Sequence, residues 1–527
     1  MNANHSTTAQ AEKLPDRKLA AQWNSIDWKQ AEAEINGLQI RIAKAAQEKQ
    51  WNRVKRLQYL ITHSYYAKVL AVRKVTTNKG KNTAGIDKIV WQSPSDKMRA
   101  ALSLSDKNYK AKPLRRVYIE KKGKKSKRPL SIPAMYDRAM QALYAMALQP
   151  VAETTADPNS YGFRKYRSCQ DACEHIFTAL SRKYSPQWVL EGDIKGCFDN
   201  ISHEWLIDNI PLDKSVLKQF LKCGYVYDGE LYPSEDGTPQ GGVISPILAN
   251  MALDGIQNML AENFDTSRKG NISSREHKKH KVNFIRYADD FIVTAINEET
   301  ATQAKRCIRE FLAQRGLQLS EEKTLITNIN EGFDFLGWNF RKFKEKLIIK
   351  PSDKSIKSLT DSLHETIIQK GRTLPQKIMI HQLNQKLTGW GNYHKSVCSK
   401  VIVNELYLCV LHPNLIEYTA DTKSQNANTK CVYYTFQKVD RTVFILLWKW
   451  ACHRHPRKGR RWIKEKYWHA KGSRNWVFAT DEAELRALSY IPIVRHPKLK
   501  LSENPYINEQ YFIERSKRIP IEAQSIV

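Results

Sequence analysis

The stretch "FIRYADDFIV", residues 284–293, places two adjacent carboxylates, Asp289 and Asp290, inside an apolar run with strong β propensity. Aspartate is disfavoured in strands, and an unpaired charge in a buried strand is costly. A hairpin tip would accommodate the pair as an ordinary turn. The alternative is that the two carboxylates meet a cation at the end of the strands.

A second apolar run upstream also ends in a carboxylate. In "WVLEGDIKGCFDNI", residues 188–201, Val189 and Leu190 lead into Asp193. Two strands that each end in an acidic residue can converge on one sheet, and a divalent cation makes such convergence tolerable. Mg²⁺ prefers hard oxygen ligands, and two such ions can clamp the attacking and leaving oxygens of phosphoryl transfer.

The composition narrows the partners of such a site. The chain has 527 residues, 41% of them hydrophobic, and a formal net charge of +31. This excess of cations predicts a polyanionic partner, most simply nucleic acid, with an acidic membrane surface as the alternative. No run approaches the ~18 apolar residues of a membrane-spanning helix, and the polar N-terminus lacks the apolar core of a signal peptide. The 9 cysteines form no paired zinc pattern, which predicts reduced thiols in a cytosol-like compartment.

The pattern along the chain predicts four segments. They are a helical extension with many Lys and Arg (1–90), a mixed β and helical segment (91–345), a helical segment with interleaved Trp and Arg (346–470), and a basic tail with little periodicity (471–527). Residues 407–435 interrupt the third segment and read as an apolar start, a polar loop and a β-prone end. Cys409 and Cys431 bracket this insertion, and we expect no disulfide between them in a reducing compartment.

The two acidic runs belong to an ordered series of motifs. In chain order they are "RPLSIP" (128–133), the run ending in Asp193, "GTPQGGVISPILANMALD" (237–254), "YADD" (287–290), "GLQLSEEKT" (316–324) and "FDFLGW" (333–338). This series resembles the reverse transcriptases. The elements "TAGIDK" (83–88), "QLNQKLTGWGNYH" (382–394) and "LLWKWACHRHPRKGRRWIKEKYW" (446–468) make it resemble, more specifically, the group II intron-encoded reverse transcriptases, or maturases. The resemblance spans most of the chain.

The resemblance implies an α+β fold: a right-hand polymerase with fingers, an antiparallel palm sheet and a helical thumb, or maturase, domain. It implies an RNA-directed DNA polymerase that also binds its intron RNA to promote splicing and retrohoming. Asp193, Asp289 and Asp290 would be the catalytic carboxylates around two Mg²⁺ ions, with Mn²⁺ able to substitute and the carbonyl of Ile194 as a further metal ligand.

The resemblance also implies a nucleotide-binding set. Lys121, or Lys122 in a shifted alignment, and Arg128 would hold the triphosphate of the incoming dNTP. Phe198 would block a ribose 2′-hydroxyl, with simple core packing as the alternative. Gln240 would approach the nucleotide or the template. Lys323 would act as general acid for the pyrophosphate, the alternative being an ordinary exposed lysine.

Basic side chains near aromatic ones predict the surfaces for RNA, because cations meet phosphates while aromatic rings pack or stack on bases. We expect Trp448 and Trp450 to face inward. The expected nucleic-acid-binding residues are Lys49, Arg53, Arg457, Lys458, Arg460 and Arg461. Arg286, just before the acidic pair, is interpreted as a structural charge partner rather than as a catalyst.

The expected partners are group II intron RNA, an RNA template, a DNA primer or target, and dNTPs, in the cytoplasm and nucleoid of a bacterium or in an organelle. No membrane association is expected, and the oligomeric state is open.

Many relatives carry a zinc-bearing endonuclease with His-Asn-His chemistry. We expect no second-strand cleavage here, because no paired CxxC motifs occur. The alternatives are a protein acting mainly as an RNA-binding splicing factor and a domesticated reverse transcriptase in repair or phage defence. Phe198 argues against an RNA-dependent RNA polymerase.

Overall fold

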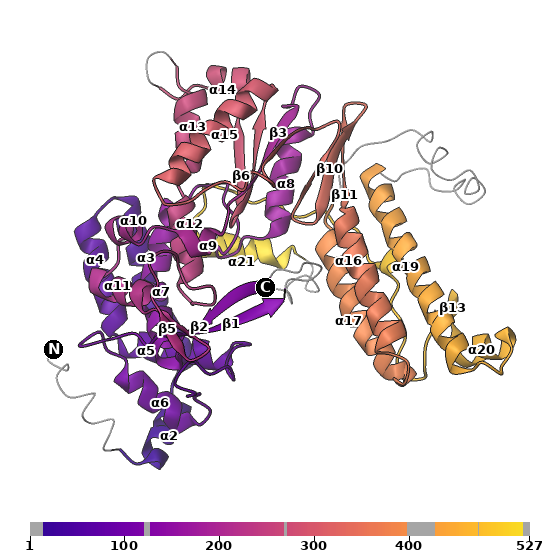
Figure 1. The fold of residues 1–527 in the computed structure, drawn as a ribbon, viewed down its shortest axis with the longest axis horizontal. Coiled ribbons are helices and arrows are strands. Elements are labelled where there is room, and N and C mark those ends of the chain that lie inside the picture. Colours follow the sequence, from indigo (N-terminus) through magenta and orange to yellow (C-terminus); the bar gives the residue numbers. More distant parts are fainter. Residues whose placement is uncertain (1–13, 121–126, 268–270, 398–426, 473, 520–527) are drawn as a thin grey trace.

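The computed structural model describes residues 14–120, 127–267, 271–397, 427–472 and 474–519, with the backbone alone for 427–434. Helices and sheets alternate through an α+β arrangement (Figure 1). Among these described residues, none of the helices has the length and apolar character needed to cross a membrane. Expectations that fall on Lys121, Lys122 and Cys409 lie outside the described residues.

The N-terminal segment forms helices because its apolar residues recur at helical spacing. On the helix at Trp28–Gln47, Ala31, Ile35 and Ile42 are buried on one face. Asp27 caps its start by accepting hydrogen bonds from the backbone N–H groups of Lys29 and Gln30. These helices pack on one another and on a long buried helix, α7. Their bounds are α2 (Asp16–Asn24), α3 (Trp28–Gln47), α4 (Trp51–His63), α5 (Tyr65–Thr77), α6 (Pro94–Ser103) and α7 (Met135–Thr155).

A small sheet projects beside α7. Its order is β2-β1-β4-β5, with β1 and β2 antiparallel and β1 and β4 parallel. The strands are β1 (Leu114–Glu120), β2 (Lys127–Ile132), β4 (Tyr225–Tyr227) and β5 (Glu230–Tyr232). The short helices of this part of the chain are α9 (Cys197–Asn200), α10 (His203–Asn209), α11 (Lys214–Lys222) and α14 (Ser274–His280).

A four-stranded antiparallel sheet of order β6-β7-β3-β8, here called the central sheet, lies at the middle of the chain. Residues 284–293 form the outer strand β6 and the inner strand β7, and the run that ends in Asp193 forms the other inner strand, β3. Its strands are β3 (Trp188–Asp193), β6 (Asn283–Tyr287), β7 (Asp290–Ala295) and β8 (Leu325–Asn328). The helices around it are α8 (Cys169–Leu180), α12 (Ser245–Leu253), α13 (Ile256–Phe264) and α15 (Glu298–Ala313).

Both faces of the central sheet are buried, and alternate residues of each strand enter two different cores. Leu190 and Phe291 pack in the core that includes α7, α13 and α15. Val189 and Ile292 pack in the core that includes α8 and the C-terminal helices. The strands are largely apolar on both sides, and Asp193 and Asp290 lie at strand ends.

The chain then leaves the central sheet through a three-stranded sheet of order β11-β10-β9 and enters a group of long helices, here called the C-terminal helices (Figure 1). The strands are β9 (Phe333–Phe335), β10 (Trp338–Phe343) and β11 (Lys346–Pro351). The helices are α16 (Asp353–His364), a π-helical turn η1 (Glu365–Gln369), α17 (Gln376–His394), α19 (Ala427–Arg454) and α20 (Arg460–Tyr467). Trp450 is buried, as expected, and Trp448 is half-buried.

One expectation for this segment is wrong. The β-prone end of the insertion, "CVYYT" at 431–435, belongs to the first turns of α19 and is helical. The isolated pentapeptide has β-type propensity, but the long helix that follows extends through it, and context overrides a propensity worth a fraction of a kilocalorie per residue, roughly 0.7 at most. The rest of the insertion up to residue 426 lies outside the described residues.

The last segment has more structure than its aperiodic sequence indicates. It contains strands β12 (Trp468–Lys471) and β13 (Arg474–Phe478), a 3₁₀ turn η3 (Leu488–Tyr490) and a helix α21 (Glu509–Lys517). The β12–β13 hairpin spans position 470. α21 returns to the central body, where Arg515 and His496 both contact the buried carboxylate of Asp171 on α8.

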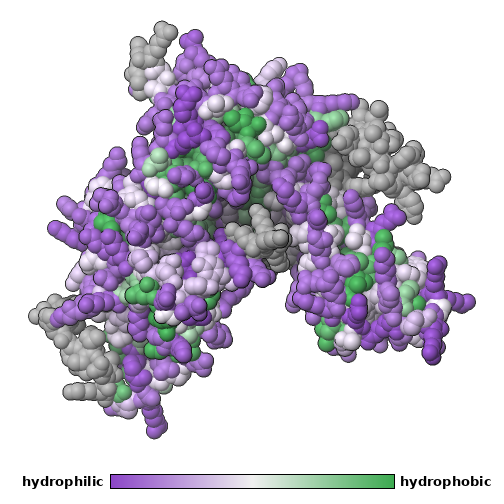
Figure 2. All heavy atoms as spheres, viewed as in Figure 1, coloured by the Kyte–Doolittle hydropathy of each residue, from purple (hydrophilic) through white to green (hydrophobic). Residues whose placement is uncertain are grey.

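Hydrophilic residues cover most of the face seen in Figure 2, and this face is hollowed between the N-terminal helices and the C-terminal helices. β1 and β2 lie toward that hollow in the ribbon view (Figure 1). The arrangement therefore leaves room for a large polar partner beside the end of the central sheet.

Candidate active site

The structure brings the acidic residues of two distant runs together at one end of the central sheet. Asp193 is the last residue of β3, Asp290 is the first residue of β7, and the two are paired across the antiparallel ladder. Asp289 lies in the tight turn between β6 and β7. The acidic pair is therefore both a hairpin tip and one half of a carboxylate cluster, so the two interpretations of the sequence describe the same place.

The carboxylates are close enough to influence one another. The pKa of Asp290 is raised to about 6, first by the protein packed around its carboxyl and then by the negative charges of Asp289 and Asp193. Lys323 opposes this rise. Like charges that raise a pKa in this way are stabilised by added positive charge, which is the condition that favours cation binding.

Lys323 supplies one positive charge at this place. Its Nζ lies 2.7 Å from Oδ2 of Asp193, and the lysine itself is exposed. The turn that carries it is fixed to the strand end, because the N–H of Ser320 donates to the backbone oxygen of Asp193 at 2.8 Å. Lys323, which the resemblance implies as a general acid, therefore lies beside Asp193. Ile194 is buried and forms a β-bridge with Leu319 of the same turn.

The donor set at the strand ends suits a hard divalent cation, because the side chains offer carboxylate oxygens and leave room for substrate oxygens. Within the described residues, no group of three or more His, Cys, Asp or Glu side chains is already arranged to hold a metal ion. The three aspartates share one strand end without forming a closed cage. An open set is the arrangement that lets substrate phosphates complete the coordination.

A buried ion pair supports the turn from behind. Arg286 on β6 is fully buried, its NH2 group lies 2.5 Å from Oδ1 of Asp254, and its NH1 group donates to Asn250 and to the carbonyl of Ala288. This matches the interpretation of Arg286 as a structural charge partner. Ala288 has a left-handed φ of 57°, a costly conformation for a residue with a Cβ. The Arg286 contact to its carbonyl helps to hold that turn.

The turn also has a close backbone neighbour. A Cβ added to Gly162 would lie 2.4 Å from the backbone nitrogen of Ala288, so only glycine permits the approach. Gly162 belongs to "YGFR", residues 161–164, a loop that the sequence analysis did not single out. A glycine between two aromatic residues in a loop was a usable signal for close packing there.

The same loop carries a residue that sequence reasoning missed. Phe163 is 52% exposed, has a φ of 59°, and places its ring edge-on to that of Phe198, with centroids 6.3 Å apart. Phe198 is half-buried, in the helix that follows Asp193. The two rings form a small aromatic wall beside the carboxylates.

A chain of hydrogen bonds joins the small sheet to this wall. Nε of Arg128, on β2, donates to Oε1 of Gln240 at 3.1 Å, and Nε2 of Gln240 donates to Oδ2 of Asp199 at 3.0 Å. Asp199 follows Phe198 directly, and the backbone oxygen of Gln240 accepts the N–H of Ser131 at 2.8 Å. Two expected nucleotide contacts, Arg128 and Gln240, therefore lie together, whereas Lys121 lies outside the described residues.

The expected nucleic-acid-binding residues lie on two separate surfaces. Lys49 and Arg53 flank the turn between α3 and α4, where a hollow of about 790 Å³ is also lined by Trp51 and Arg56. The second set lies around the start of α20 and consists of Arg457, Lys458, Arg460 and Arg461, all exposed. Arg461 pairs with Glu465 at 3.0 Å, a surface contact of small energetic value.

Family models match three parts of the chain. Residues 119–340 match the reverse transcriptase (RNA-dependent DNA polymerase) model, and residues 23–104 match the N-terminal domain of reverse transcriptase. Residues 356–412 and 428–468 match the group II intron, maturase-specific domain. The first match contains all of the central sheet and its three aspartates. The gap in the third match falls within the 407–435 insertion.

Curated relatives agree with these matches. The group II intron-encoded protein LtrA of Lactococcus lactis subsp. cremoris is 30% identical over 415 residues, covering 67% of this chain and 68% of that protein. Protein YkfC of Escherichia coli K12 is 31% identical over 334 residues, covering 58% of this chain and 87% of that protein. An uncharacterized 91 kDa protein in the cob intron of Schizosaccharomyces pombe is 29% identical over 405 residues, covering 62% of this chain and 49% of that protein.

Proposed function

The chain belongs to the family of group II intron-encoded proteins and is an RNA-directed DNA polymerase, and we propose that its chemistry takes place at the ends of β3 and β7. The observation that carries this proposal is the pairing of Asp193 with Asp290 across the central sheet, next to Asp289. The reaction joins the primer 3′-hydroxyl to the α-phosphate of a dNTP and releases pyrophosphate. Primer extension on an RNA template with the aspartates altered one at a time tests it.

Reverse transcriptases generally use Mg²⁺, and Asp193 and Asp289 would hold two such ions here with Asp290 beside them. When bound, the metal supplies charge neutralisation for the attacking hydroxyl and the leaving phosphate oxygens. The protein itself orients the carboxylates. The antiparallel pairing of β3 and β7 fixes Asp193 opposite Asp290, and the ion pair of Arg286 with Asp254 fixes the turn that carries Asp289. The carbonyl of Ile194 is proposed as a further ligand.

Lys323 is proposed to move a proton. Its Nζ pairs with Asp193, so a proton donor lies beside the proposed metal ligands, and the leaving pyrophosphate would accept the proton. Arg128 and Gln240, joined by a hydrogen bond, would contact the triphosphate and the nucleotide or template. Lys121 is kept as a further proposed triphosphate contact on the basis of the sequence alone.

A first prediction concerns sugar selection. Phe198→Ala should raise the ratio of ribonucleotide to deoxynucleotide incorporation by about 10–100-fold, because it opens room for a 2′-hydroxyl where one aromatic ring stood. Phe163→Ala should raise the same ratio by a smaller factor, because the Phe198 ring loses its edge-on neighbour. Single-nucleotide incorporation kinetics measure both. Tyr184→Ala, at a residue 80% exposed outside the site, is the control and should leave the ratio unchanged. An unaltered ratio in Phe198→Ala would assign that ring to core packing.

A second prediction concerns pH and metal. The pKa of Asp290 is raised to about 6, so this carboxyl gains a proton as the pH falls through that value. Metal ligands must be deprotonated, so the Mg²⁺ concentration that gives half-maximal extension should rise as the pH drops below about 6. A Mg²⁺ titration of the extension rate at several pH values measures this. Asp290→Asn should flatten the dependence, and an unchanged dependence in that variant would contradict the assignment.

The overall arrangement is proposed to be that of a right-hand polymerase. β1 and β2 correspond to fingers, the central sheet to the palm, and α16, α17 and α19 to the thumb. Residues 1–90 are proposed as the RNA-binding extension, 91–345 as fingers and palm, 346–470 as thumb, and 471–527 as a tail that contacts target DNA.

The chain also has a splicing function, because it carries the maturase-specific domain. Its proposed partner is the intron RNA, held by the surface at Lys49 and Arg53 and by the surface at Arg457, Lys458, Arg460 and Arg461. Splicing and DNA synthesis should separate by mutation: Asp289→Asn should preserve maturase-dependent splicing while removing extension. If Asp289→Asn removes splicing as well as primer extension, the two activities share the carboxylate site.

A further inference from the structure

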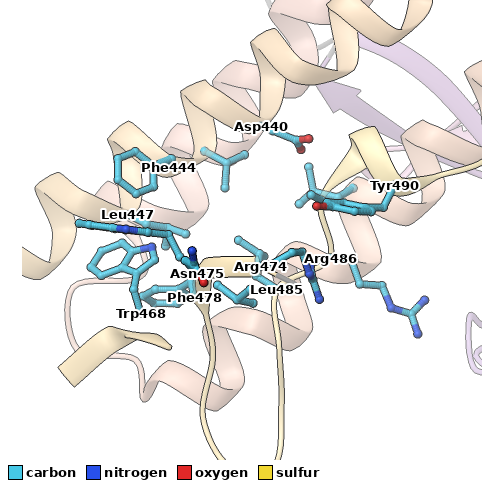
Figure 3. A pocket seen from close by; sticks show the side chains of 15 residues that line it. Asp440, Phe444, Leu447, Trp468, Arg474, Asn475, Phe478, Leu485, Arg486 and Tyr490 are labelled. Atoms are coloured by element: carbon cyan, nitrogen blue, oxygen red, sulfur yellow. The ribbon is translucent and has the colours of Figure 1, made fainter. Parts of the chain in front are cut away.

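A pocket next to the β12–β13 hairpin, here called the hairpin pocket, lies apart from the polymerase site and plays no part in it. It has a volume of about 430 Å³ and lies between α17, α19, the hairpin and η3. Figure 3 shows Phe444 and Trp468 toward one end of it, Tyr490 at the other, and Asp440 on α19 above the opening. Residues 469–490, which form much of it, fall outside all three family matches.

The wall of the hairpin pocket is aromatic, and part of it faces solvent. Trp476 is 52% exposed and Tyr490 is 66% exposed. The ring of Trp476 packs against the ring of Phe444, with centroids 6.1 Å apart, and against that of Trp448, with centroids 6.2 Å apart. These contacts hold the exposed ring in place. Large rings that are rigidly supported yet exposed are expensive to leave in water and are the usual platforms for stacked bases.

Cations accompany these rings. The guanidinium of Arg474 lies 5.0 Å from the ring centroid of Tyr490 and also pairs with the exposed carboxylate of Glu484 at 3.0 Å. Nζ of Lys464 lies 5.6 Å from the ring centroid of Trp476. Arg486 is exposed at the rim. The carboxylate of Asp440 is already used, because its two oxygens accept the N–H groups of Leu488 and Ser489 at 2.8 and 3.0 Å. The pocket therefore presents aromatic faces and positive charge to a partner.

We propose that the hairpin pocket binds an unpaired stretch of single-stranded RNA, with a base stacked on Trp476 or Tyr490 and the adjoining phosphates on Arg474 and Arg486. The charge and the aromatic faces together fit a nucleic acid better than a lipid or an apolar peptide. RNA is favoured over DNA for two reasons. The helices behind the pocket belong to the group II intron maturase-specific match, and the exposed amide of Asn475 can bond a ribose 2′-hydroxyl.

The proposal rests on the RNA-binding function proposed above but uses a different part of the chain from the carboxylates. Its test compares the affinity of the full chain for a short oligoadenosine RNA with its affinity for an abasic RNA of the same length, at about 0.5 M salt to weaken backbone contacts. The ratio of the two affinities isolates base stacking from the general attraction of a basic protein for phosphates.

Trp476→Ala combined with Tyr490→Ala should lower that ratio by about tenfold, within the range measured for loss of one stacked base. Trp476→Phe, which keeps an aromatic face, should retain most of it. Tyr184→Ala is the matched control, since it removes an exposed aromatic ring elsewhere. All variants should keep wild-type primer extension, which shows that they are folded and separates this test from that of the polymerase site.

An unchanged ratio in the double variant would overturn the proposal and leave the aromatic surface to a protein partner. The same measurement with oligodeoxyadenosine shows whether the pocket distinguishes RNA from DNA. An equal loss for the DNA oligomer would overturn the assignment to RNA, and a loss confined to RNA would support it.

Discussion

We expect Asp289→Asn to lower the single-turnover rate of RNA-templated primer extension by about 10³-fold or more, because the change removes a negative charge from the proposed metal site. Asparagine has nearly the same volume as aspartate, and Asp289 lies in a turn at the surface of the sheet. The fold should therefore survive. Asp193→Asn should have a comparable effect, because Asp193 faces the same end of the ladder.

The control for this prediction is Asp361→Asn. Asp361 is exposed on α16, in a different part of the chain, and the same chemical change there should leave the rate near that of the wild type. Binding of the primer–template should be similar in all variants, so the loss should appear in the rate and not in the affinity. Extension by Asp289→Asn at the wild-type rate would remove this residue from the reaction.

The second large effect is expected at Arg286. Arg286→Leu should lower the stability of the central body by roughly 3–5 kcal/mol, because it leaves the buried carboxylate of Asp254 without its partner. Burial already raises the pKa of Asp254, to about 7, and the guanidinium of Arg286 opposes that rise. The change also removes hydrogen bonds to Asn250 and to the carbonyl of Ala288, behind the acidic turn. Urea denaturation followed by tryptophan fluorescence measures the shift in midpoint.

The sign of the pH effect tests the cause. Without Arg286 the pKa of Asp254 rises further, so near pH 6 the carboxyl is neutral and the loss in stability should be smaller than at about pH 8.5, where it is ionised. Arg286→Leu with Asp254→Asn should recover part of the loss, since the unpaired charge of Asp254 is removed. Arg309→Leu, which removes an exposed ion pair with Glu321, is the control and should cost less than about 1 kcal/mol. A loss in Arg286→Leu that is independent of pH would contradict the role given to Asp254.

The parts of this structure that the sequence predicted are those with local signals. The apolar runs that end in Asp193 and in the Asp289–Asp290 pair became the strands and turn of the central sheet, because continuous β-prone apolar runs and the acids at their ends are visible in the sequence itself. The N-terminal helices followed from helical spacing of apolar residues. Motif order singled out Lys323, but its contact with Asp193 is visible only in the structure.

The parts that could not be predicted depend on contacts between distant segments. The edge-on packing of Phe163 on Phe198 joins two loops, and neither loop alone indicates it. The return of α21 to the central body involves contacts between distant segments, among them the buried carboxylate of Asp171, which contacts His496 and Arg515. The hairpin at 468–478 is short, and its Trp and Arg pattern read as an aperiodic basic tail.

The most direct measurement is a Mg²⁺ titration of primer extension by the wild-type chain on an RNA template with dNTPs. The account predicts full-length DNA product that depends on Mg²⁺, disappears with a chelator, and is absent from Asp289→Asn under the same conditions. Product that forms without a divalent cation, or a folded, RNA-binding chain that makes no product at any Mg²⁺ concentration, would contradict the assignment of the Asp193, Asp289 and Asp290 cluster as the polymerase site.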